Sequence, residues 1–230
     1  MRRMMISASV FACALAICGS GAQAVTLPFS EEFATDVSGW ENNANAPLTW
    51  VASGGPDGSS FAQASFNYFG FSNPFGGGPV IFRASDSDNA SGDAFVGDWL
   101  AAGVASVSAW VYQDTGVDLT YFLRVATAFN FPGAVIANPQ TVQSGEWTLL
   151  TWAIDPTSAL CTGETVTCAQ ALATVGNFQI GTSAPASLTS LDQAFTFGVD
   201  GVSLSAVPEP AALALLGAGA IGLIGMGRRR

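Results

Sequence analysis

Acidic side chains are the groups of this sequence that are best suited to chemistry. The chain contains 17 Asp and Glu but no His and no Lys. Without His a Ser-His-Asp or Cys-His arrangement cannot form, and without Lys there is no amine nucleophile. A pair of carboxylates could still hydrolyse a glycosidic bond. Because no spacing singles out one such pair, the sequence predicts a protein that is not an enzyme.

The charge distribution separates the ends of the chain from its middle. Five of the seven arginines lie near the two ends, and only Arg83 and Arg124 lie between residues 25 and 207. This middle part carries sixteen acidic side chains, which gives it a net charge of −14. Such a surface repels nucleic acid and anionic lipid, and it suits calcium or a neutral partner better.

Residues 1–24 have the three parts of a secretory signal peptide. A positive start, MRRMM, precedes the apolar run ISASVFACALAIC, and AQA at 22–24 has the A-x-A form that signal peptidase cuts. We therefore expect the mature chain to begin at Val25. Processing as a lipoprotein before Cys18 is a weaker alternative, because the bulky Ile17 precedes that cysteine.

The exported part keeps two cysteines, Cys161 and Cys168, in the stretch CTGETVTC. Two close cysteines in an exported protein predict a disulfide. The loop that it would close is short, so the chain-entropy model assigns it only about 2 to 3 kcal/mol of stabilisation. Metal binding is the alternative, although two thiols without His make a poor zinc site.

The C-terminal stretch AVPEPAALALLGAGAIGLIGMGRRR contains glycines with the spacing of a dinucleotide-binding loop. Gly217, Gly219 and Gly222 fit the pattern G-x-G-x-x-G. That fingerprint needs a strand before it, a helix after it and an acidic residue about 20 positions on, whereas only eight residues follow Gly222. Glycines in an apolar run more often let membrane helices pack closely. The pattern therefore does not predict a nucleotide cofactor.

The apolar run at 211–227 instead predicts a short transmembrane helix. Its 17 residues carry no charge and would span about 26 Å, near the lower limit for crossing a bilayer. Three arginines follow it, and the positive-inside rule places them in the cytoplasm. These are Arg228, Arg229 and Arg230. The N-terminal signal places the rest of the chain on the opposite side, so both ends indicate one topology.

Four residues precede this run: Val207, Pro208, Glu209 and Pro210. The prolines keep the segment extended, so that an enzyme can read it at the membrane face. VPEP, the apolar run and GRRR together resemble the PEP-CTERM sorting signal of Gram-negative bacteria, over residues 206–230. The resemblance implies an exported protein that is held in the inner membrane, processed by an exosortase-type enzyme and then placed at the cell surface or outside the cell. The family is associated with extracellular polysaccharide and biofilm material.

Residues 25–205 have the pattern of one all-β domain. Short apolar runs between Gly, Pro, Asn and Asp predict strands at 48–54, 60–66, 79–85, 104–114, 118–127, 146–155 and 194–204. Alternation predicts that two sets of residues face the core: Val107, Ala109 and Val111, and Leu119, Tyr121, Leu123 and Val125. The link QDTGVD indicates a hairpin, and 167–176 is the single plausible short helix. The pattern predicts an antiparallel β-sandwich or jelly roll.

Several stretches of this domain follow an order typical of jelly rolls. They are FSEEFATDVSGW, TWVASGGPDGSSFA, FVGDW, GEWTLLTWAID and FTFGVDGVSL. The domain resembles the laminin-type and carbohydrate-binding-module-like folds, in which the first and last strands lie close together. The resemblance implies that Glu31 or Glu32 shares a structural Ca²⁺ with Asp200, because calcium takes hard oxygen ligands. A solvated acidic rim is the alternative, and no other cofactor is expected.

The same resemblance implies exposed aromatic residues that stack on sugar rings. One or two exposed aromatic residues are expected among Trp99, Trp110 and Tyr112, although a strand Trp more often belongs to the core. Trp147 and Trp152 lie an odd number of residues apart, so at most one of them faces the core of a regular strand.

The sequence therefore predicts an exported surface or extracellular-matrix protein with a structural or adhesive role and glycan binding. A secreted glycoside-active enzyme that uses a carboxylate pair is the alternative. The expected partners are signal peptidase, an exosortase-type enzyme, the inner membrane and extracellular polysaccharide. Nucleic acid is not expected as a partner, because the exported part is strongly acidic.

Overall fold

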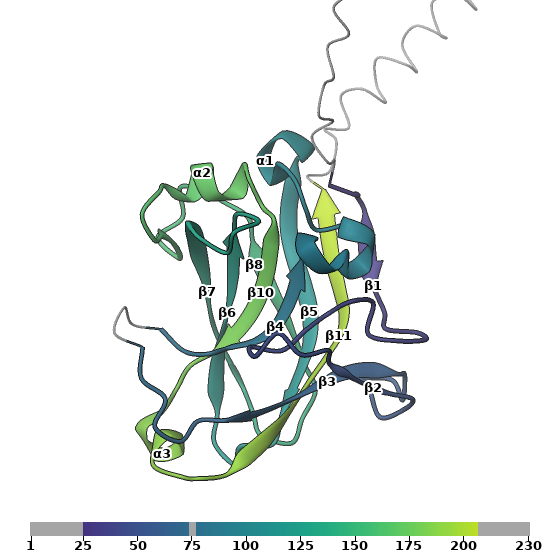
Figure 1. Cartoon of the computed structure of the whole chain (residues 1–230), viewed down its shortest axis with the longest axis vertical. Coiled ribbons are helices and arrows are strands. Elements are labelled where there is room, and N and C mark those ends of the chain that lie inside the picture. The colour runs from purple at the N-terminus through teal and green to yellow at the C-terminus, as the bar shows by residue number, and fades with distance from the viewer. Residues whose placement is uncertain (1–24, 74–76, 207–230) are drawn as a thin grey trace, which may run out of the picture.

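Two antiparallel β-sheets form a sandwich in the computed structural model, which describes residues 25–73 and 77–206 (Figure 1). The six-stranded sheet contains β1 (Phe29–Glu31), β2 (Thr49–Val51), β3 (Phe61–Asn67), β5 (Val104–Gln113), β8 (Thr148–Ala153) and β11 (Ala194–Ala206). The five-stranded sheet contains β4 (Val80–Ser85), β6 (Leu119–Ala126), β7 (Gly133–Val142), β9 (Cys161–Gly163) and β10 (Asn177–Thr182). Each of the seven predicted strands is present, and the all-β sandwich prediction is confirmed.

The long strand β11 organises the six-stranded sheet. The strand order is β2-β3-β11-β5-β8, and β1 pairs with the second half of β11. β11 pairs with β3 through its first six residues and with β5 along most of its length. The first and last strands of the domain are therefore hydrogen-bonded neighbours. The five-stranded sheet has the order β4-β10-β6-β7-β9.

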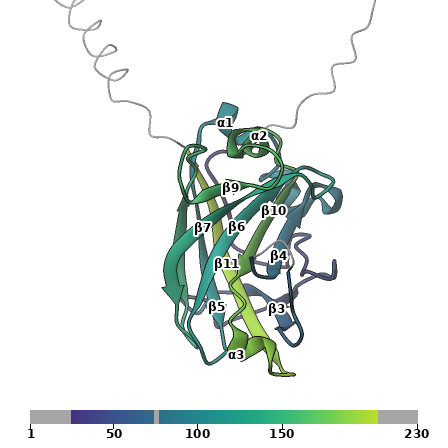
Figure 2. The ribbon, with the colours of Figure 1, turned by 90° about the vertical axis from the view of Figure 1, so that its left-hand side faces the viewer.

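Short helices cover the two ends of the sandwich (Figure 2). They are α1 (Trp99–Ala102), α2 (Cys168–Leu172) and α3 (Ala186–Thr189), together with the 3₁₀ turns Asp86–Asp88 and Ala90–Asp93. A capping box between Thr167 and Gln170 begins α2, so the helix predicted at 167–176 is present but shorter. In the described residues no helix has the length and hydropathy needed to cross a membrane. The predicted signal peptide at 1–24 and apolar span at 211–227 lie outside the described residues.

Inward-facing residues of both sheets build the core, as the alternation of the strands predicts. Val107, Ala109 and Val111 of β5 are buried, and so are the residues of β6 that were expected to share a face. A group of aromatic rings fills one end of the core. Phe95 stacks on Phe178 with ring centroids 4.7 Å apart, and Trp40 stands nearly perpendicular to both. Burying each such side chain stabilises the fold by about 1.5–3 kcal/mol.

The predicted hairpin between β5 and β6 is wrong, because the two strands belong to different sheets. Gln113 at the end of β5 is buried, and its side-chain amide donates hydrogen bonds to the carbonyls of Val117 and Val142. Thr115 donates to the oxygen of the same amide. The buried side chain of Gln113 therefore holds the link in place as it crosses from one sheet to the other.

Candidate functional site

The outer face of the six-stranded sheet carries aromatic and acidic side chains. In β5 the inward positions leave Trp110 and Tyr112 pointing outward. On the neighbouring strand β11, Asp200 pairs with Trp110 and Gly198 pairs with Tyr112. Because paired residues of an antiparallel sheet lie on the same face, both rings stand beside β11 on its outer side.

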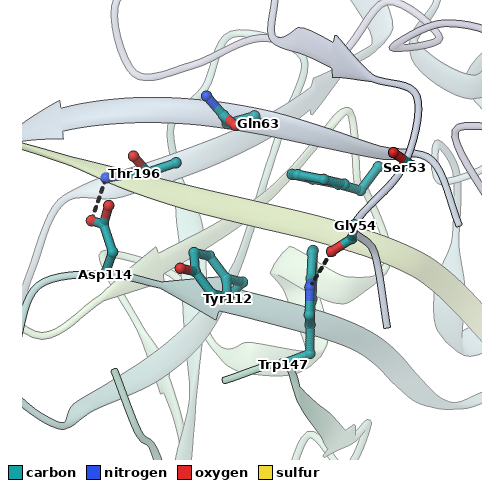
Figure 3. A pocket seen from close by; sticks show the side chains of 8 residues that line it. Ser53, Gly54, Gln63, Tyr112, Asp114, Trp147 and Thr196 are labelled. Atoms are coloured by element: carbon teal, nitrogen blue, oxygen red, sulfur yellow. Dashed lines mark hydrogen bonds between the residues drawn. The ribbon is translucent and has the colours of Figure 1, made fainter. Parts of the chain in front are cut away.

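One hollow on this face has a volume of about 330 Å³. It is lined by Ser53, Gly54, Phe61, Gln63, Tyr112, Asp114, Trp147 and Thr196 (Figure 3). The lining comes from β3, β5, β11 and the segments that lead out of β2 and into β8. We call it the first hollow.

Trp147 forms one wall of the first hollow. Its Nε1–H donates to the carbonyl of Gly54 at 2.8 Å (Figure 3), and its ring centroid lies 5.6 Å from that of Tyr112 and 5.2 Å from that of Phe61. The indole lies across Gly198, where a Cβ atom would come within 2.7 Å of the ring. The missing side chain at Gly198 therefore lets Trp147 reach across β11.

Polar groups stand beside these rings. The carboxylate of Asp114 accepts a hydrogen bond from the backbone N–H of Thr196 at 2.6 Å (Figure 3). The backbone N–H of Asp114 also donates to the Thr196 carbonyl at 3.2 Å. Gln63 adds an amide and Ser53 a hydroxyl to the lining. The first hollow therefore offers aromatic surface together with a few oriented hydrogen-bonding groups, which is the usual composition of a small-molecule site.

A second hollow of about 330 Å³ lies further along the same strands. It is lined by Glu32, Pro56, Asp57, Ser59, Ser108, Trp110, Leu149, Asp200, Gly201 and Ser203. Each charged residue that lines either hollow is acidic. This face therefore has a negative potential that no lining cation neutralises.

Asp200 is the most buried carboxylate of the second hollow, with 4% of its surface exposed. It accepts hydrogen bonds from the Ser59 hydroxyl at 2.7 Å and from the Gly201 N–H at 2.9 Å. Burial raises the pKa of this carboxyl above its ordinary value, and the nearby charges of Glu32 and Asp57 raise it further. The two hydrogen bonds oppose this shift in pKa but do not cancel it.

Of the two glutamates that were alternatives for sharing a calcium ion with Asp200, Glu32 lies near Asp200 and Glu31 does not. Glu32 and Asp200 line the second hollow together, but Glu31 lies elsewhere and accepts from the Ser91 hydroxyl at 2.7 Å. Glu31 is the last residue of β1 and Glu32 follows the strand, and their side chains have different neighbours. Within the described ranges, no three acidic or cysteine residues are grouped so that they could hold a metal ion. The calcium site therefore stays a prediction, and Asp57 is the third carboxylate of that hollow.

The predicted aromatic ligand residues have two different positions. Trp99 is fully buried and donates its Nε1–H to the Phe95 carbonyl, so its assignment as an exposed aromatic residue is wrong. It begins α1 and packs its ring into the core instead. Trp110 and Tyr112 lie on the outer face, one in each hollow. Their role in ligand binding stays a prediction.

Sequence reasoning did not select Trp147 as a site residue. Trp152 is buried, so Trp147 is the partner that points away from the core, as their odd spacing allows. Nothing in the sequence indicates that Trp147 reaches back across Gly198 to Gly54. The spacing to Trp152 is the one signal that could have identified it.

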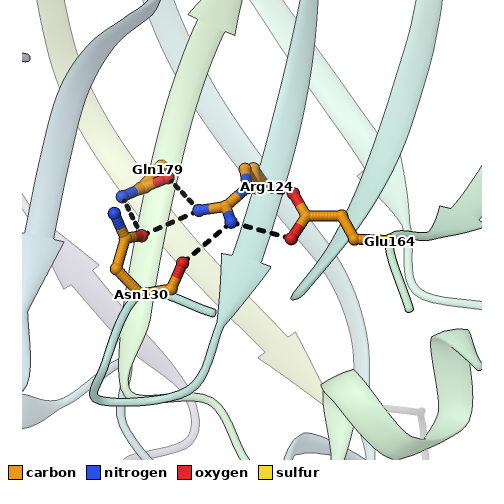
Figure 4. Close-up of polar contacts among 4 residues, drawn as sticks. All are labelled: Arg124, Asn130, Glu164 and Gln179. Atoms are coloured by element: carbon orange, nitrogen blue, oxygen red, sulfur yellow. Dashed lines mark hydrogen bonds and ion pairs between the residues drawn. The ribbon is translucent and has the colours of Figure 1, made fainter. Parts of the chain in front are cut away.

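The outer face of the five-stranded sheet carries a different polar group. Arg83 of β4, Gln179 of β10 and Arg124 of β6 are aligned across three neighbouring strands. Arg124 makes an ion pair with Glu164 at 2.6 Å and also bonds Gln179 and both oxygens of Asn130 (Figure 4). These contacts, with a second bond to Glu164, match the five donors of a guanidinium. Arg124 therefore has no donor left for a ligand.

The predicted disulfide between Cys161 and Cys168 is present. It joins β9 to the first residue of α2 and closes the short segment that carries Glu164. The covalent link and the ion pair to Arg124 therefore hold the same segment against the sheet.

Comparison with known proteins identifies the C-terminal segment. The family model for the PEP-CTERM protein-sorting motif matches residues 206–230, which confirms the sorting-signal prediction. The motif implies an exported protein that a membrane-associated exosortase handles. No curated protein matches the chain.

Solved structures with similar folds include carbohydrate-binding modules. An exo-beta-agarase structure is 12% identical with a TM-score of 0.50, over 79% of this chain and 26% of that one. A family 11 module from Clostridium thermocellum, in complex with a β-1,3-1,4-mixed-linked tetrasaccharide, is 12% identical with a TM-score of 0.48, over 82% and 100%. The CBM22-1–GH10 modules of xylanase 10B from the same organism, complexed with xylohexaose, are 16% identical with a TM-score of 0.44, over 78% and 28%. The chain therefore spans about a quarter of the agarase and xylanase chains, and these likenesses concern the fold alone.

Proposed function

We propose that the domain of this PEP-CTERM-sorted chain is a non-catalytic module that binds a neutral polysaccharide on the outer face of its six-stranded sheet. The observation that carries the proposal is the first hollow, where Tyr112 and Trp147 present ring surface beside the carboxylate of Asp114. Sugar rings have apolar C–H faces and hydroxyl edges, so they match aromatic surface with a few hydrogen-bonding groups. Such binding would give the protein an adhesive or structural role in an extracellular matrix.

The arrangement of the two hollows favours a chain of sugars over a single one. Tyr112 lines the first hollow, and Trp110, two residues earlier in the same strand, lines the second. Two residues along a strand correspond to about 7 Å. A polysaccharide that follows β5 and β11 would therefore pass from one ring to the next.

The charge of the lining favours a neutral ligand. Asp114 lines the first hollow, and Glu32, Asp57 and Asp200 line the second. Uronic acids and sulfated sugars carry negative charge, which these carboxylates would repel at close range. We therefore expect neutral polysaccharides to bind more tightly than acidic ones of the same length.

The route of export completes the proposal. Signal peptidase would cut after Ala24, and the apolar run at 211–227 would hold the chain in the inner membrane with Arg228, Arg229 and Arg230 in the cytoplasm. The exosortase would then act at the motif that contains Pro208, Glu209 and Pro210, and the domain would reach the cell surface. The order of these features in the sequence and the family match at 206–230 support this route.

Affinity electrophoresis of the released protein in gels that contain neutral or acidic polysaccharides tests the proposal. We expect Tyr112→Ala to weaken binding to the retained neutral polysaccharide about tenfold, which corresponds to about 1.4 kcal/mol. Trp50→Ala is the matched control, because Trp50 is an exposed tryptophan of the same sheet that lines neither hollow. Absence of retention of the wild-type protein on any neutral polysaccharide would refute the proposal.

The same gels separate binding from the alternative, a glycoside-active enzyme. A carboxylate pair that cleaves a glycosidic bond releases new reducing ends, and this release stops when one of the two carboxylates becomes an amide. We expect no new reducing ends from any polysaccharide that the wild-type protein retains. Release that is abolished in Asp200→Asn would establish the enzymatic alternative in place of our proposal.

A further inference from the structure

One end of the sandwich exposes large apolar side chains. Phe129 is 92% exposed and Phe131 is 56% exposed, both in the loop between β6 and β7, and Leu100 of α1 is exposed as well. We call these three residues the apolar end. Exposed aromatic side chains that lie close together in a loop indicate an interaction surface.

Hydrogen bonds hold this loop in one conformation. The backbone N–H of Thr127 donates to the carbonyl of Pro132 at 3.1 Å, and its hydroxyl donates to the carbonyl of Phe131 at 2.8 Å. Arg124 donates to the side-chain and backbone oxygens of Asn130 at 2.8 and 2.9 Å (Figure 4). The loop that exposes the two phenylalanines is therefore fixed by hydrogen bonds, so their exposure is part of its ordered conformation.

The apolar end lies where β11 leaves the sandwich. Ala206, the last residue of β11, pairs with Val104, which follows α1 closely in the chain. The segment before α1 bridges to Val175 through Gly97, and the next residue, Gly176, packs against Ala128 in the loop. Figure 1 shows α1 and the tip of β11 together at this end.

The chain from β11 to the apolar run is short. Val207 follows Ala206 directly, and the apolar run starts at Ala211. Five residue steps reach at most about 18 Å when fully extended. While the apolar run is in the membrane, the end of β11 must therefore lie within about 18 Å of the membrane surface.

We propose that the apolar end rests on the lipid surface of the bilayer while the chain is anchored, with Phe129 and Phe131 in the interfacial layer. Phenylalanine and leucine side chains enter the boundary between headgroups and acyl chains by burying apolar surface. Apolar burial has to provide this contact, because the strongly acidic domain is repelled by anionic lipid. The inference rests on the anchoring that is part of the proposed function.

The tether makes this contact reversible. Weak membrane-binding elements hold a protein at a membrane only when they act together. The apolar run keeps the two rings close to the lipid and so raises their effective concentration there. Cleavage at the sorting motif removes the tether, and the released domain then leaves the membrane surface.

Site-specific p-cyanophenylalanine in the full chain tests this contact. The label replaces Phe129, Phe131 or Phe69, and each protein is reconstituted into phosphatidylethanolamine–phosphatidylglycerol vesicles with or without brominated acyl chains. Phe69 is the matched control, because it is 58% exposed and lies next to Gly70, which bonds Thr189 of α3 at the opposite end. Energy transfer to the tryptophans lowers the emission of the label equally in both kinds of vesicle. The ratio of label emission with and without bromine therefore reports contact with lipid alone.

We expect brominated lipid to quench the label at 129 and 131 and to leave the label at 69 unchanged. Equal emission with and without bromine at 129 and 131, or equal quenching at all three positions, would overturn the inference. Vesicle flotation tests the anchoring of the chain separately from the lipid contact of the apolar end. Protein that floats with the vesicles without quenching refutes the contact alone, whereas protein that does not float refutes the anchoring and the contact with it.

Discussion

On the outer face of the five-stranded sheet, Arg124 is engaged by Glu164, Asn130 and Gln179, and its hydrogen bonds match its five donors. On the outer face of the six-stranded sheet, polar groups surround hollows that are large enough for a ligand. Both faces look functional from residue types alone, since both combine charges with amides. The difference is whether the charges are neutralised within the fold, because Arg124 pairs with Glu164 whereas among the described residues no cation lines the hollows that contain Asp114 and Asp200. This difference separates a structural cluster from a candidate site.

The largest expected effect follows from removing Arg124. The variant Arg124→Met leaves Glu164 and the amides of Gln179 and Asn130 without their shared donor. We expect a loss of about 2 kcal/mol of unfolding free energy, because hydrogen bonds to a charged group are worth about 1.5–3 kcal/mol, whereas the ion pair to the partly exposed Glu164 adds little. Urea denaturation of the released protein measures this loss.

Arg83→Met is the matched control, because Arg83 flanks Gln179 from the other side. The guanidinium of Arg83 donates to Asn45, and its Nε has no hydrogen-bond partner in the part of the chain that the structure describes. We expect this variant to cost about 1 kcal/mol, the value of one ordinary hydrogen bond. Equal losses in the two variants would show that the network around Arg124 adds nothing beyond a single contact.

The next effect tests the first hollow without removing an aromatic residue. In Gly198→Ala the new Cβ would lie 2.7 Å from the indole of Trp147, so the ring must move away from its place over β11. We expect polysaccharide binding to fall about tenfold, or about 1.4 kcal/mol. Overpacking of this kind also costs about 1–3 kcal/mol of stability, so binding is measured well below the melting temperature.

Ser205→Ala is the control for this variant, because Ser205 lies on the same strand, is exposed and lines neither hollow. It should bind like the wild-type protein. Unchanged affinity of Gly198→Ala would mean that the position of the Trp147 ring does not matter to the ligand. The distinction between the two outer faces would then rest on the second hollow alone.

Much of the fold follows from local patterns in the sequence. Alternation places Val107 and Leu123 in the core correctly, because a period of two is a direct consequence of strand geometry. Alternation does not predict β10, because all six of its residues are buried and neighbouring groups cover its outward amides. The hairpin prediction for the link after β5 fails because turn residues indicate only that the chain changes direction. They do not indicate which sheet the next strand joins, and the buried amide of Gln113 holds the link as it crosses to the other sheet.

The site is less accessible to sequence reasoning than the fold. Trp110 and Tyr112 follow from the alternation of β5, but Trp99 does not, because the short helix α1 turns it into the core. The first hollow depends on Trp147 meeting Gly54, 93 residues away in the chain. No local sequence pattern can indicate a contact between residues so far apart in the chain. The pairing of β11 with β5 and β3 brings the two residues together.

The smallest expected effect concerns Asp200 and the pH. Its pKa is raised in the folded protein, chiefly by burial, above the ordinary value of 3.8. The folded state therefore holds this proton more tightly than the unfolded chain, and stability decreases as the pH rises through the interval between the two pKa values. Asp200→Asn has no such proton, and its amide can keep the contacts to Ser59 and Gly201.

In the presence of a chelator we therefore expect Asp200→Asn to melt above the wild-type protein at neutral pH, and this difference to shrink as the pH falls toward the ordinary carboxyl pKa of about 4. A difference that does not change with pH would show that Asp200 is not desolvated. Calcium reverses the expected sign at neutral pH if Glu32 and Asp200 hold it, because the ion then stabilises the wild-type protein and not the variant. Equal melting of the wild-type protein in calcium and in chelator would contradict the predicted calcium site. The second hollow would then differ from the Arg124 cluster in carrying negative charge that no cation among its described lining residues neutralises.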